Sequence, residues 1–393
     1  MPDNSLIVAA QWLLAAPVAA MLGWFALETG LGLVPLRRPA LAGPVPATAI
    51  LVPAHDEAGG IAATVTALRA AAPGARVLVV ADNCSDQTAA LARGAGAEVA
   101  ERSDPARRGK GYALAFGRER LAADPPAVVI VIDADCRLAP GAADLLAREV
   151  AAGAGPVQAA NLLVGQAGDP PQVAISNFAM MVKNLFRARG MLRLGGSGLL
   201  FGTGMAFPWT LFARLPLATG DATEDISLGL DLAREGVRVR LADHARVTSP
   251  PAALAQSRGQ RSRWEHGFLR SMGRQGLPLL ARGLSSGSRR LAAIGAHMLV
   301  PPLALLVMAG AAALALVGLA VPLGGSPWPA MLLAAGFAAA SLALLAAWAA
   351  GGRAVLSGRQ LLAIPAYVLW KLPIYLGFFS RRRQVTWNRT DRS

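Results

Sequence analysis

Two long stretches without a charged residue constrain this chain more than any other feature. No Asp, Glu, Lys or Arg occurs at positions 4–27, or at the sixty positions from Leu291 to Ala350. A helix of about twenty apolar residues is long enough to cross the hydrocarbon core of a bilayer. The sequence therefore predicts an N-terminal transmembrane helix in residues 1–34 and two more in residues 291–350, the first of these two interrupted by Pro301 and Pro302.

A third apolar run covers residues 360–379, and unlike the other stretches it contains a charged residue, Lys371. Three arginines follow it at positions 381–383. A complete crossing would leave these arginines outside, against the preference of positive charge for the cytosolic side. Residues 351–393 are therefore expected to form an interfacial or re-entrant segment with a basic tail, and a third C-terminal membrane crossing is the alternative.

The distribution of charge indicates the partners of the chain. Its formal net charge is +14, yet only 16% of the residues are charged and 54% are apolar. The arginines gather beside the apolar stretches, since eight Arg and one acidic residue lie between Ala252 and Arg290. The positive-inside rule and anionic lipid headgroups explain such flanking charge. We therefore expect membrane lipids as partners and no nucleic acid.

The residues around the first helix predict its orientation. Asp3 precedes it, whereas Arg37 and Arg38 follow it, which places the N-terminus outside and the next domain in the cytosol. The two cysteines, Cys84 and Cys136, form no CxxC motif, and a chain without a disulfide framework fits the cytosol. We expect a multi-pass protein of the cell (inner) membrane whose soluble domain is cytosolic.

A proline-rich linker at residues 35–46 precedes a soluble domain that we expect at residues 47–250. Short β-branched runs alternate there with helix-like stretches. Buried parallel strands appear as continuous apolar runs, and the helices between them cover both faces of the sheet. The pattern predicts a doubly wound α/β fold, in which ligands bind beyond the carboxyl ends of the strands.

Two later stretches combine apolar and basic residues. Residues 172–194 suit either an amphipathic helix at a membrane surface or an ordinary helix that faces a core, because the hydrophobic pattern does not separate the two. Residues 252–284 carry more positive charge, which favours the membrane interface. We expect basic amphipathic interface helices at residues 251–290.

Acidic side chains follow the predicted strands of the soluble domain. Asp133 and Asp135 come directly after its most apolar run. Two carboxylates with one residue between them can hold a hard divalent cation that keeps positions for water and phosphate oxygens, while a helix cap or a turn is the alternative. Asp82 ends an earlier strand, where a carboxylate can accept hydrogen bonds from a base or a ribose hydroxyl.

Three further motifs have both a chemical and a structural explanation. Lys110 lies in RRGKG at a predicted helix start, where a cation is favourable only if it shares a bound phosphate with the helix N–H groups; a solvated loop is the alternative. The run Thr223-Glu224-Asp225 heads another helical stretch, where capping alone also accounts for polar residues. In QRSRW, Arg263 can neutralise a leaving diphosphate, and Trp264 can pack on a sugar or anchor the chain at the membrane.

Taken together and in this order, the motifs resemble the membrane-bound family 2 glycosyltransferases, the superfamily of cellulose, chitin, hyaluronan and poly-N-acetylglucosamine synthases and ceramide glucosyltransferases. The match runs from about Ala49 to Gly267, and the family more often has Asn at the position of Asp56. The similar segments are ILVPAHDE (50–57), VVADNCSD (79–86), RGKGYAL (108–114), IDADC (132–136), FGTGMAF (201–207), TED (223–225) and QRSRW (260–264).

The resemblance implies a GT-A-type nucleotide-sugar-binding domain with α-helical transmembrane segments. It implies an inverting, metal-dependent glycosyltransferase that moves a sugar from a UDP-sugar to a glycan or lipid acceptor at the membrane, as in polysaccharide synthesis. In this scheme Asp225, beside Glu224, removes the proton of the acceptor hydroxyl. Asp135 binds Mg²⁺ or Mn²⁺ on the diphosphate.

The same motifs imply which residues bind the substrates. Asp82 would contact the nucleoside, Asp133 the ribose or the sugar, and Lys110 and Arg263 the leaving UDP, whereas Gln260 and Trp264 would border the acceptor channel. Pro53 and Glu57, in the opening strand motif, complete the substrate-binding set.

Two other interpretations compete with this one. A sugar-nucleotide pyrophosphorylase would need a Gly-rich basic loop after the first strand, where this chain has PAHDEAGG. A catalytically inactive, transferase-like subunit could instead bind a nucleotide or glycan within an export complex. The sequence leaves open the donor sugar, the acceptor, the number of sugars added per binding event, and the presence of export or assembly partner subunits.

Overall fold

The computed structural model describes residues 4–379 except 42, 166, 167, 222 and 251–253, and it leaves out the side chains of residues 154, 254–261 and 263. The chain divides into two compact units. In the described part, one unit is α/β and holds residues 35–165 and 196–268. The other is helical and holds residues 4–34, 168–195 and 269–379.

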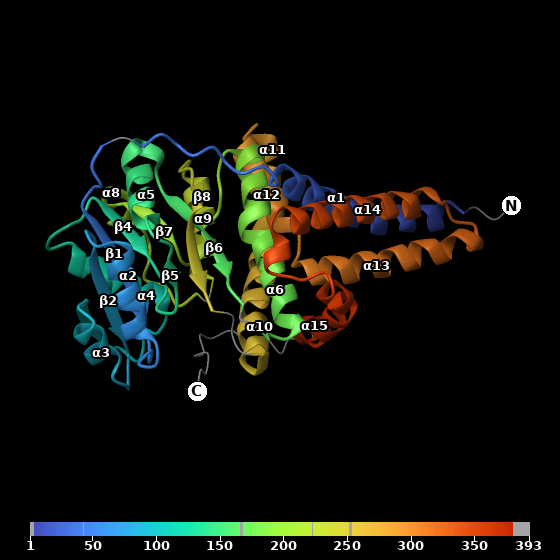
Figure 1. The fold of residues 1–393 in the computed structure, drawn as a ribbon. Coiled ribbons are helices and arrows are strands. Elements are labelled where there is room, and N and C mark those ends of the chain that lie inside the picture. Colours follow the sequence, from blue (N-terminus) through green and yellow to red (C-terminus); the bar gives the residue numbers. More distant parts are fainter. Residues whose placement is uncertain (1–3, 42, 166–167, 222, 251–253, 380–393) are drawn as a thin grey trace. The chain divides into compact units, whose positions relative to one another are not determined.

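The α/β unit is built on one eight-stranded sheet (Figure 1). Its strand order is β3-β2-β1-β4-β7-β6-β8-β5. The first four of these strands are parallel, and the apolar runs of β1, β2 and β4 are buried on both faces, as expected for a sheet between two helical layers. The strands are β1 Thr48–Ala54, β2 Arg76–Asp82, β3 Glu98–Arg102, β4 Val128–Val131, β5 Arg137–Leu138, β6 Val157–Leu163, β7 Met205–Pro208 and β8 Arg240–Ser249.

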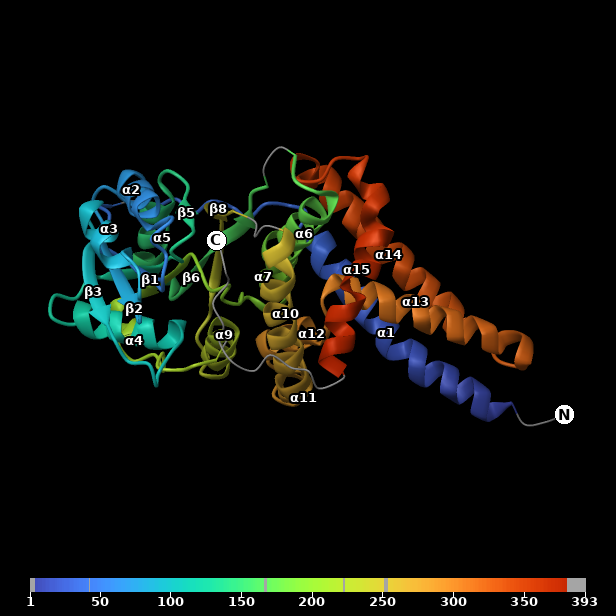
Figure 2. The same ribbon diagram turned by 90° about the horizontal axis from the view of Figure 1, so that it is seen from below.

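Helices cover both faces of this sheet (Figure 2). α2 (Ile61–Ala71), α3 (Thr88–Gly94) and α5 (Ala142–Glu149) lie on one face, over a core that includes Ile50, Val79 and Ile130. α4 (Lys110–Leu121), α8 (Trp209–Phe212) and α9 (Glu224–Arg234) lie on the other, over the alternate residues of the same strands. The predicted α/β sheet with helices on both faces is confirmed.

The second half of the sheet is mixed rather than parallel. β7 pairs antiparallel with both β4 and β6, and β5 pairs antiparallel with β8. β6 and β8 are parallel, with a register shift between Ala159 and Ala160. The sequence pattern weakens after residue 156, so these strands were not expected. Their pairing is decided by contacts between distant segments rather than by a local period.

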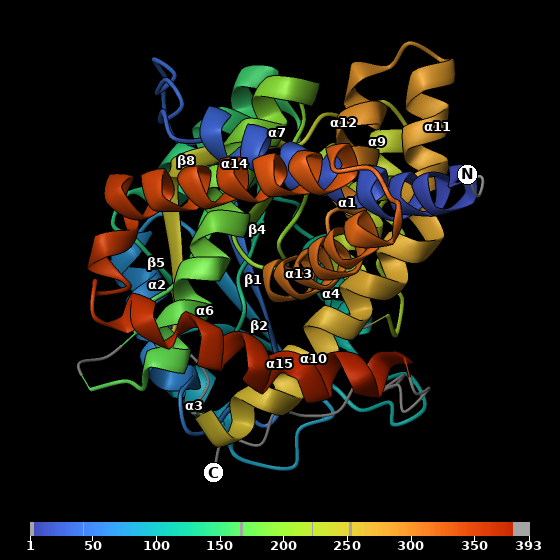
Figure 3. The same cartoon turned by 90° about the vertical axis from the view of Figure 1, so that its right-hand side faces the viewer.

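Among the described residues, the helical unit contains four helices that are long and apolar enough to cross a membrane: Ser5–Leu31 (α1), Leu303–Leu323 (α13 and η4), Trp328–Ala350 (α14) and Gln360–Phe378 (η6 and α15). α1 and α14 run side by side, and α13 packs against both (Figures 1 and 3). Gln11 of α1 donates from its amide nitrogen to the Val317 carbonyl oxygen at 2.9 Å, which satisfies a buried polar group between helices.

Two segments differ from the sequence-based expectation. The stretch after Leu291 is two helices, α12 (Arg289–Leu299) and α13 (Leu303–Ala320), because Pro302 has no N–H to donate and the chain restarts there. Residues 168–195, expected inside one continuous domain, belong to the helical unit. They form α6 (Pro171–Met181), η2 (Val182–Arg187) and α7 (Ala188–Gly195), and α7 and η2 pack on α1.

The basic segment after β8 is helical. α10 covers Leu254–Ser271, η3 covers Met272–Gly276 and α11 covers Leu277–Ser285. Ser288 caps the next helix, α12, because its side chain accepts a hydrogen bond from the Leu291 N–H. The sequence prediction of helices at residues 251–290 agrees with these bounds, and their place at a membrane interface stays a prediction.

Candidate active site

The polar residues after β1, β2 and β4 lie at one edge of the sheet. The three strands are adjacent and parallel, so their carboxyl ends point the same way. Asp82 is the last residue of β2, and Asp133 follows β4 by two residues. This edge is where an α/β sheet of this kind presents side chains to a ligand.

Lys110 joins three distant parts of the chain at this edge. Its ammonium lies 2.5 Å from Asp133 Oδ1 and 3.7 Å from Glu224 Oε1, and it donates to the Gly202 carbonyl oxygen at 2.6 Å. Asp225 Oδ1 accepts a hydrogen bond of 2.8 Å from the Ile226 N–H. We call Lys110, Asp133, Glu224 and Asp225 the Lys110 cluster.

Charges in the Lys110 cluster alter its protonation. Burial raises the pKa of Glu224 to about 7, because the loss of hydration and the charges of Asp225 and Asp133 outweigh the attraction of Lys110. Burial lowers the pKa of the Lys110 ammonium, but the carboxylates of Asp133, Glu224 and Asp225 more than offset this, and the net pKa is raised. Lys110 is therefore a permanent cation, whereas Glu224 can gain or lose a proton near neutral pH.

The side chains beside Asp133 can hold a hard divalent cation. One potential ligand atom from each of Asp133, Asp135 and Cys136 lies within 4.8 Å of the others. Burial and the charges of Asp135 and Asp133 raise the pKa of the Cys136 thiol, so it stays neutral and is a poor ligand. The two carboxylates are the oxygen donors that Mg²⁺ and Mn²⁺ prefer, and they add to a site where acidic groups outnumber the Lys110 ammonium.

Asp82 lies at the same edge with a partner of its own. Its Oδ1 is 2.6 Å from a guanidinium nitrogen of Arg102, at the end of β3, and accepts a hydrogen bond of 3.0 Å from the Asn83 amide. Both side chains of the ion pair are at least nine-tenths buried. Sequence reasoning missed Arg102, although a cation that ends the strand next to Asp82 in a predicted parallel sheet was the available signal.

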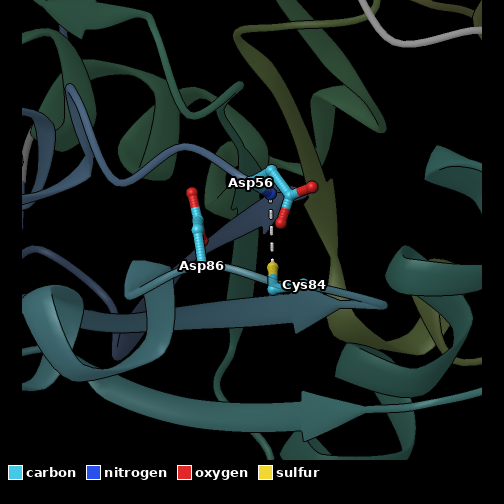
Figure 4. Close-up of side chains that lie close together, drawn as sticks. All are labelled: Asp56, Cys84 and Asp86. Carbon is cyan, nitrogen blue, oxygen red and sulfur yellow. Dashed lines mark hydrogen bonds between the residues drawn. The ribbon is translucent and has the colours of Figure 1, made fainter.

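A second acidic group, Asp56, Cys84 and Asp86, fixes the loops after β1 and β2 (Figure 4). Asp56 Oδ1 accepts from the Ser85 N–H at 2.6 Å, and the Asp56 N–H points to the Cys84 sulfur at 3.4 Å. Asp86 accepts from the Ala58 N–H at 3.0 Å. Carboxylate oxygens here serve backbone N–H groups, so the group ties two loops together.

Asp56 has a backbone conformation that suits its residue type. Its φ is +51°, in the left-handed region where Asn and Asp are the favoured residues other than glycine. In the turn before α3, Asp86 Oδ1 accepts from the Thr88 N–H at 2.9 Å. The Ser85 hydroxyl bonds to Asp56.

The remaining predicted residues lie in β1, in the loop after it and on α10. Pro53 is half-buried in β1, and the Glu57 N–H donates to Thr88 Oγ1 at 2.7 Å. Trp264 is on α10 with 41% of its surface exposed. Gln260 and Arg263 lie on α10 as well, but their side chains are outside the described part of the structure.

The loop before β7 completes the described site. Gly202 has a φ of +81°, and Asp225 Oδ2 would be 3.2 Å from a Cβ placed there, so glycine lets the loop approach the acid closely. The next residue, Thr203, accepts a hydrogen bond of 3.1 Å from the Asp133 N–H. The loop that leads into β7 thus contacts the Lys110 cluster. The sequence pattern did not predict β7.

Comparisons with known proteins identify the family and the fold of the chain. The profile of a family described as "Glycosyltransferase like family 2" matches residues 46–267. No curated protein sequence matches the chain. A mannosyltransferase from Pyrobaculum calidifontis, solved in complex with GDP-Man and Mn²⁺, is similar at a TM-score of 0.57 and 18% identity, over 91% of this chain and all of its own.

A glucosyl-3-phosphoglycerate synthase from Mycobacterium tuberculosis, solved with Mn²⁺, UDP and phosphoglyceric acid, has 21% identity and a TM-score of 0.39, over 56% of this chain and 78% of its own. At sequence identities this low, a similar structure supports the fold and not the activity. Of these two structures, the mannosyltransferase has a TM-score high enough to support the fold. The family profile, in contrast, spans more than half of the sequence. This chain belongs to glycosyltransferase family 2.

Proposed function

We propose that the chain is an inverting, metal-dependent glycosyltransferase that moves a sugar from a UDP-sugar to a glycan or lipid acceptor at the membrane. The observation that carries the proposal is the Lys110 cluster, in which a permanent cation and three acids from distant segments meet at the carboxyl edge of the sheet. A site for nucleotide-sugar transfer needs this combination, because the leaving diphosphate is anionic and the attacking hydroxyl must lose a proton.

Asp225 is the proposed base. A sugar hydroxyl is too weak an acid to attack well, and a positioned base contributes about 10²- to 10⁴-fold in rate. Glu224, the next residue, has a pKa of about 7 and is the second proton-accepting group of the pair. One base opposite the leaving group implies inversion at the anomeric carbon, and no second carboxylate nucleophile is required.

Lys110 is the proposed electrostatic partner of the donor. Its ammonium is 2.5 Å from Asp133, so it lies beside the carboxylate proposed to assist in holding the cation of the donor diphosphate. Asp135, assisted by Asp133, would hold Mg²⁺ or Mn²⁺, which when bound offsets negative charge on the leaving UDP. Asp82 orients the nucleoside, and its pair with Arg102 fixes its carboxylate. Pro53 and Glu57 border this donor site.

The acceptor side is proposed to face the membrane. The four long apolar helices support a multi-pass protein of the cell membrane, and the arginines at positions 37, 38 and 252–290 support a cytosolic catalytic domain. On α10, Trp264 is exposed, as a residue that packs on a sugar or lipid acceptor would be. Gln260 and Arg263 are proposed to act beside it.

The test of the proposal is nucleotide release and product formation by the purified full chain in detergent or lipid nanodiscs. A panel of UDP-sugars, with GDP-mannose included, is supplied with Mn²⁺ or Mg²⁺ and with membrane lipids or oligosaccharides as acceptors. We expect UDP release with at least one donor, and a product of inverted anomeric configuration by NMR. Donor binding without release under any condition would instead favour an inactive subunit of an export complex.

Asp225→Asn is the variant that tests the base. It keeps the shape of the side chain but removes its basicity, so transfer should fall below one thousandth of the wild-type rate while UDP affinity stays within twofold. Asp231→Asn is the matched control, because Asp231 lies on the same helix and pairs with exposed Arg234. Unchanged turnover in Asp225→Asn would remove this residue from the mechanism.

A further inference from the structure

A glycine of α10 touches the first turn of α9. α9 begins with Glu224, and Thr223 directly precedes it. A Cβ added at Gly267 would lie less than 3.0 Å from Thr223 Cγ2, a separation that real Cβ atoms essentially never show. Helix interiors disfavour glycine by about 1 kcal/mol relative to alanine. Close packing against Thr223 gives a physical reason for a glycine at position 267.

Thr223 cannot easily move away from α10. It is 7% exposed, and Asp221 Oδ1 accepts hydrogen bonds from its N–H at 3.0 Å and its hydroxyl at 3.1 Å. Asp221 Oδ2 also accepts from the Ser227 hydroxyl at 2.8 Å, one turn into α9. Asp221 therefore holds both the residue before the helix and a residue within it, so this turn moves as one piece.

The turn carries the proposed base. Glu224 and Asp225 are its first two helical residues, and Asp225 Oδ2 lies close to the backbone of Gly202. A displacement of Thr223 therefore passes directly to the two acids of the Lys110 cluster. Displacing a catalytic group by about 1 Å can cost about 10²-fold in rate.

We propose that Gly267 is a positioning residue, which sets Asp225 at its working distance by letting α10 pack directly on Thr223. Asp221 is the second positioning residue, because it holds the turn from the other side. The inference rests on the proposed function, since it assigns Asp225 as the base. It adds that the helix bearing the QRSRW motif and the helix bearing the base share a close contact.

Gly267→Ala tests the contact by adding one methyl group. We expect kcat for transfer to fall about 10²-fold, with KM for the UDP-sugar and the Kd for UDP within twofold. Gly273→Ala is the matched control, because a Cβ at Gly273, six residues later, meets nothing within 4 Å. That variant should keep full activity and an equal or higher melting temperature.

A second substitution separates positioning from general damage. Thr223→Ser removes the methyl that the new alanine would meet and keeps the hydroxyl that bonds to Asp221. The double variant Gly267→Ala with Thr223→Ser should therefore recover at least tenfold of the lost kcat. Full activity of Gly267→Ala, or no recovery in the double variant, would overturn the proposal.

Asp221→Ala keeps the test open if Gly267→Ala does not fold. Asp221 is exposed, and its removal adds no atom to the core. We expect kcat about tenfold lower with UDP affinity unchanged, and wild-type kcat in this variant contradicts the positioning role. The two proposals fail differently, because a wild-type chain without transfer refutes the proposed function, whereas an active wild type with fully active Gly267→Ala refutes only this inference.

Discussion

Each unit of the molecule has a cluster of opposite charges built from distant segments, and the two clusters differ in how deeply they are buried. In the helical unit, Glu28 of α1 accepts from Arg187 at 2.8 Å, from Trp24 at 2.9 Å and lies 2.9 Å from His297 Nδ1, so both of its oxygens are engaged. We call Glu28, Arg187 and His297 the Glu28 cluster. In the Lys110 cluster, the ammonium faces the carboxylates of Asp133 and Glu224.

The difference separates a structural role from a chemical one. Burying a charge costs several kcal/mol unless partners replace its hydration. The Glu28 cluster supplies those partners from three helices, and its side chains are at most 7% exposed. The Lys110 cluster is 15–36% exposed at Lys110, Asp133 and Glu224, so a ligand can reach it.

The largest expected effect follows from removing the ammonium of the Lys110 cluster. Lys110→Met keeps the length of the side chain and leaves Asp133, Glu224 and Asp225 without their ammonium. We expect transfer to fall about 10²- to 10³-fold, because a preorganised charge at the leaving group is lost. Steady-state kinetics measure it. A fall in transfer rate of less than threefold would mean that the substrate does not contact the Lys110 cluster, as we expect for the Glu28 cluster.

Substitutions in the Glu28 cluster should change the stability of the protein rather than its rate of transfer. Glu28→Leu leaves Arg187 buried without its counter-ion, and we expect a loss of about 3 kcal/mol in the free energy of unfolding. The double variant Glu28→Leu with Arg187→Met removes both charges and should recover most of that loss. Thermal and denaturant unfolding in detergent measure both. If Glu28→Leu kept normal stability but lost turnover, the Glu28 cluster would have a chemical role and not a structural one.

A smaller effect is expected in how the stability of the protein depends on pH, through Glu224 of the Lys110 cluster. The folded state binds the Glu224 proton more tightly than the unfolded state, since burial raises this pKa from 4.5 to about 7. Its contribution to stability is therefore full below pH 4.5 and is lost as pH rises through about 7. The melting temperature of Glu224→Gln should decline less than that of wild type over this range. Glu235→Gln, at the exposed end of α9, should keep the wild-type slope.

The smallest effect is expected at a surface group that resembles neither cluster. Arg76 pairs with Glu98 at 3.0 Å and Asp124 at 2.7 Å, but Glu98 is 50% and Asp124 83% exposed. Arg76→Met should change the free energy of unfolding by at most about 1 kcal/mol and leave turnover intact. Chemical denaturation and the transfer assay check it. A loss of activity comparable to that of Lys110→Met would show that removal of any cation from this unit is harmful.

Local sequence determined a large part of this protein. Apolar runs marked α1, α13 and α14, because a helix that crosses a bilayer must be apolar along about twenty residues. Continuous β-branched runs marked β1, β2 and β4, and the acids after them fell at one edge because parallel strands end together. The resemblance of the motifs to a known family singled out the members of the Lys110 cluster, and their roles in catalysis stay proposals.

Tertiary structure alone decided what those residues touch. No local period reveals that β7 inserts antiparallel between β4 and β6, that Arg102 pairs with Asp82, or that residues 168–195 leave the α/β unit. Nor does it reveal that Gly267 touches Thr223. Propensity and hydrophobic pattern report on neighbours along the chain, whereas charge pairing and close packing depend on which distant segments share a space, and that is settled only when the whole chain has folded.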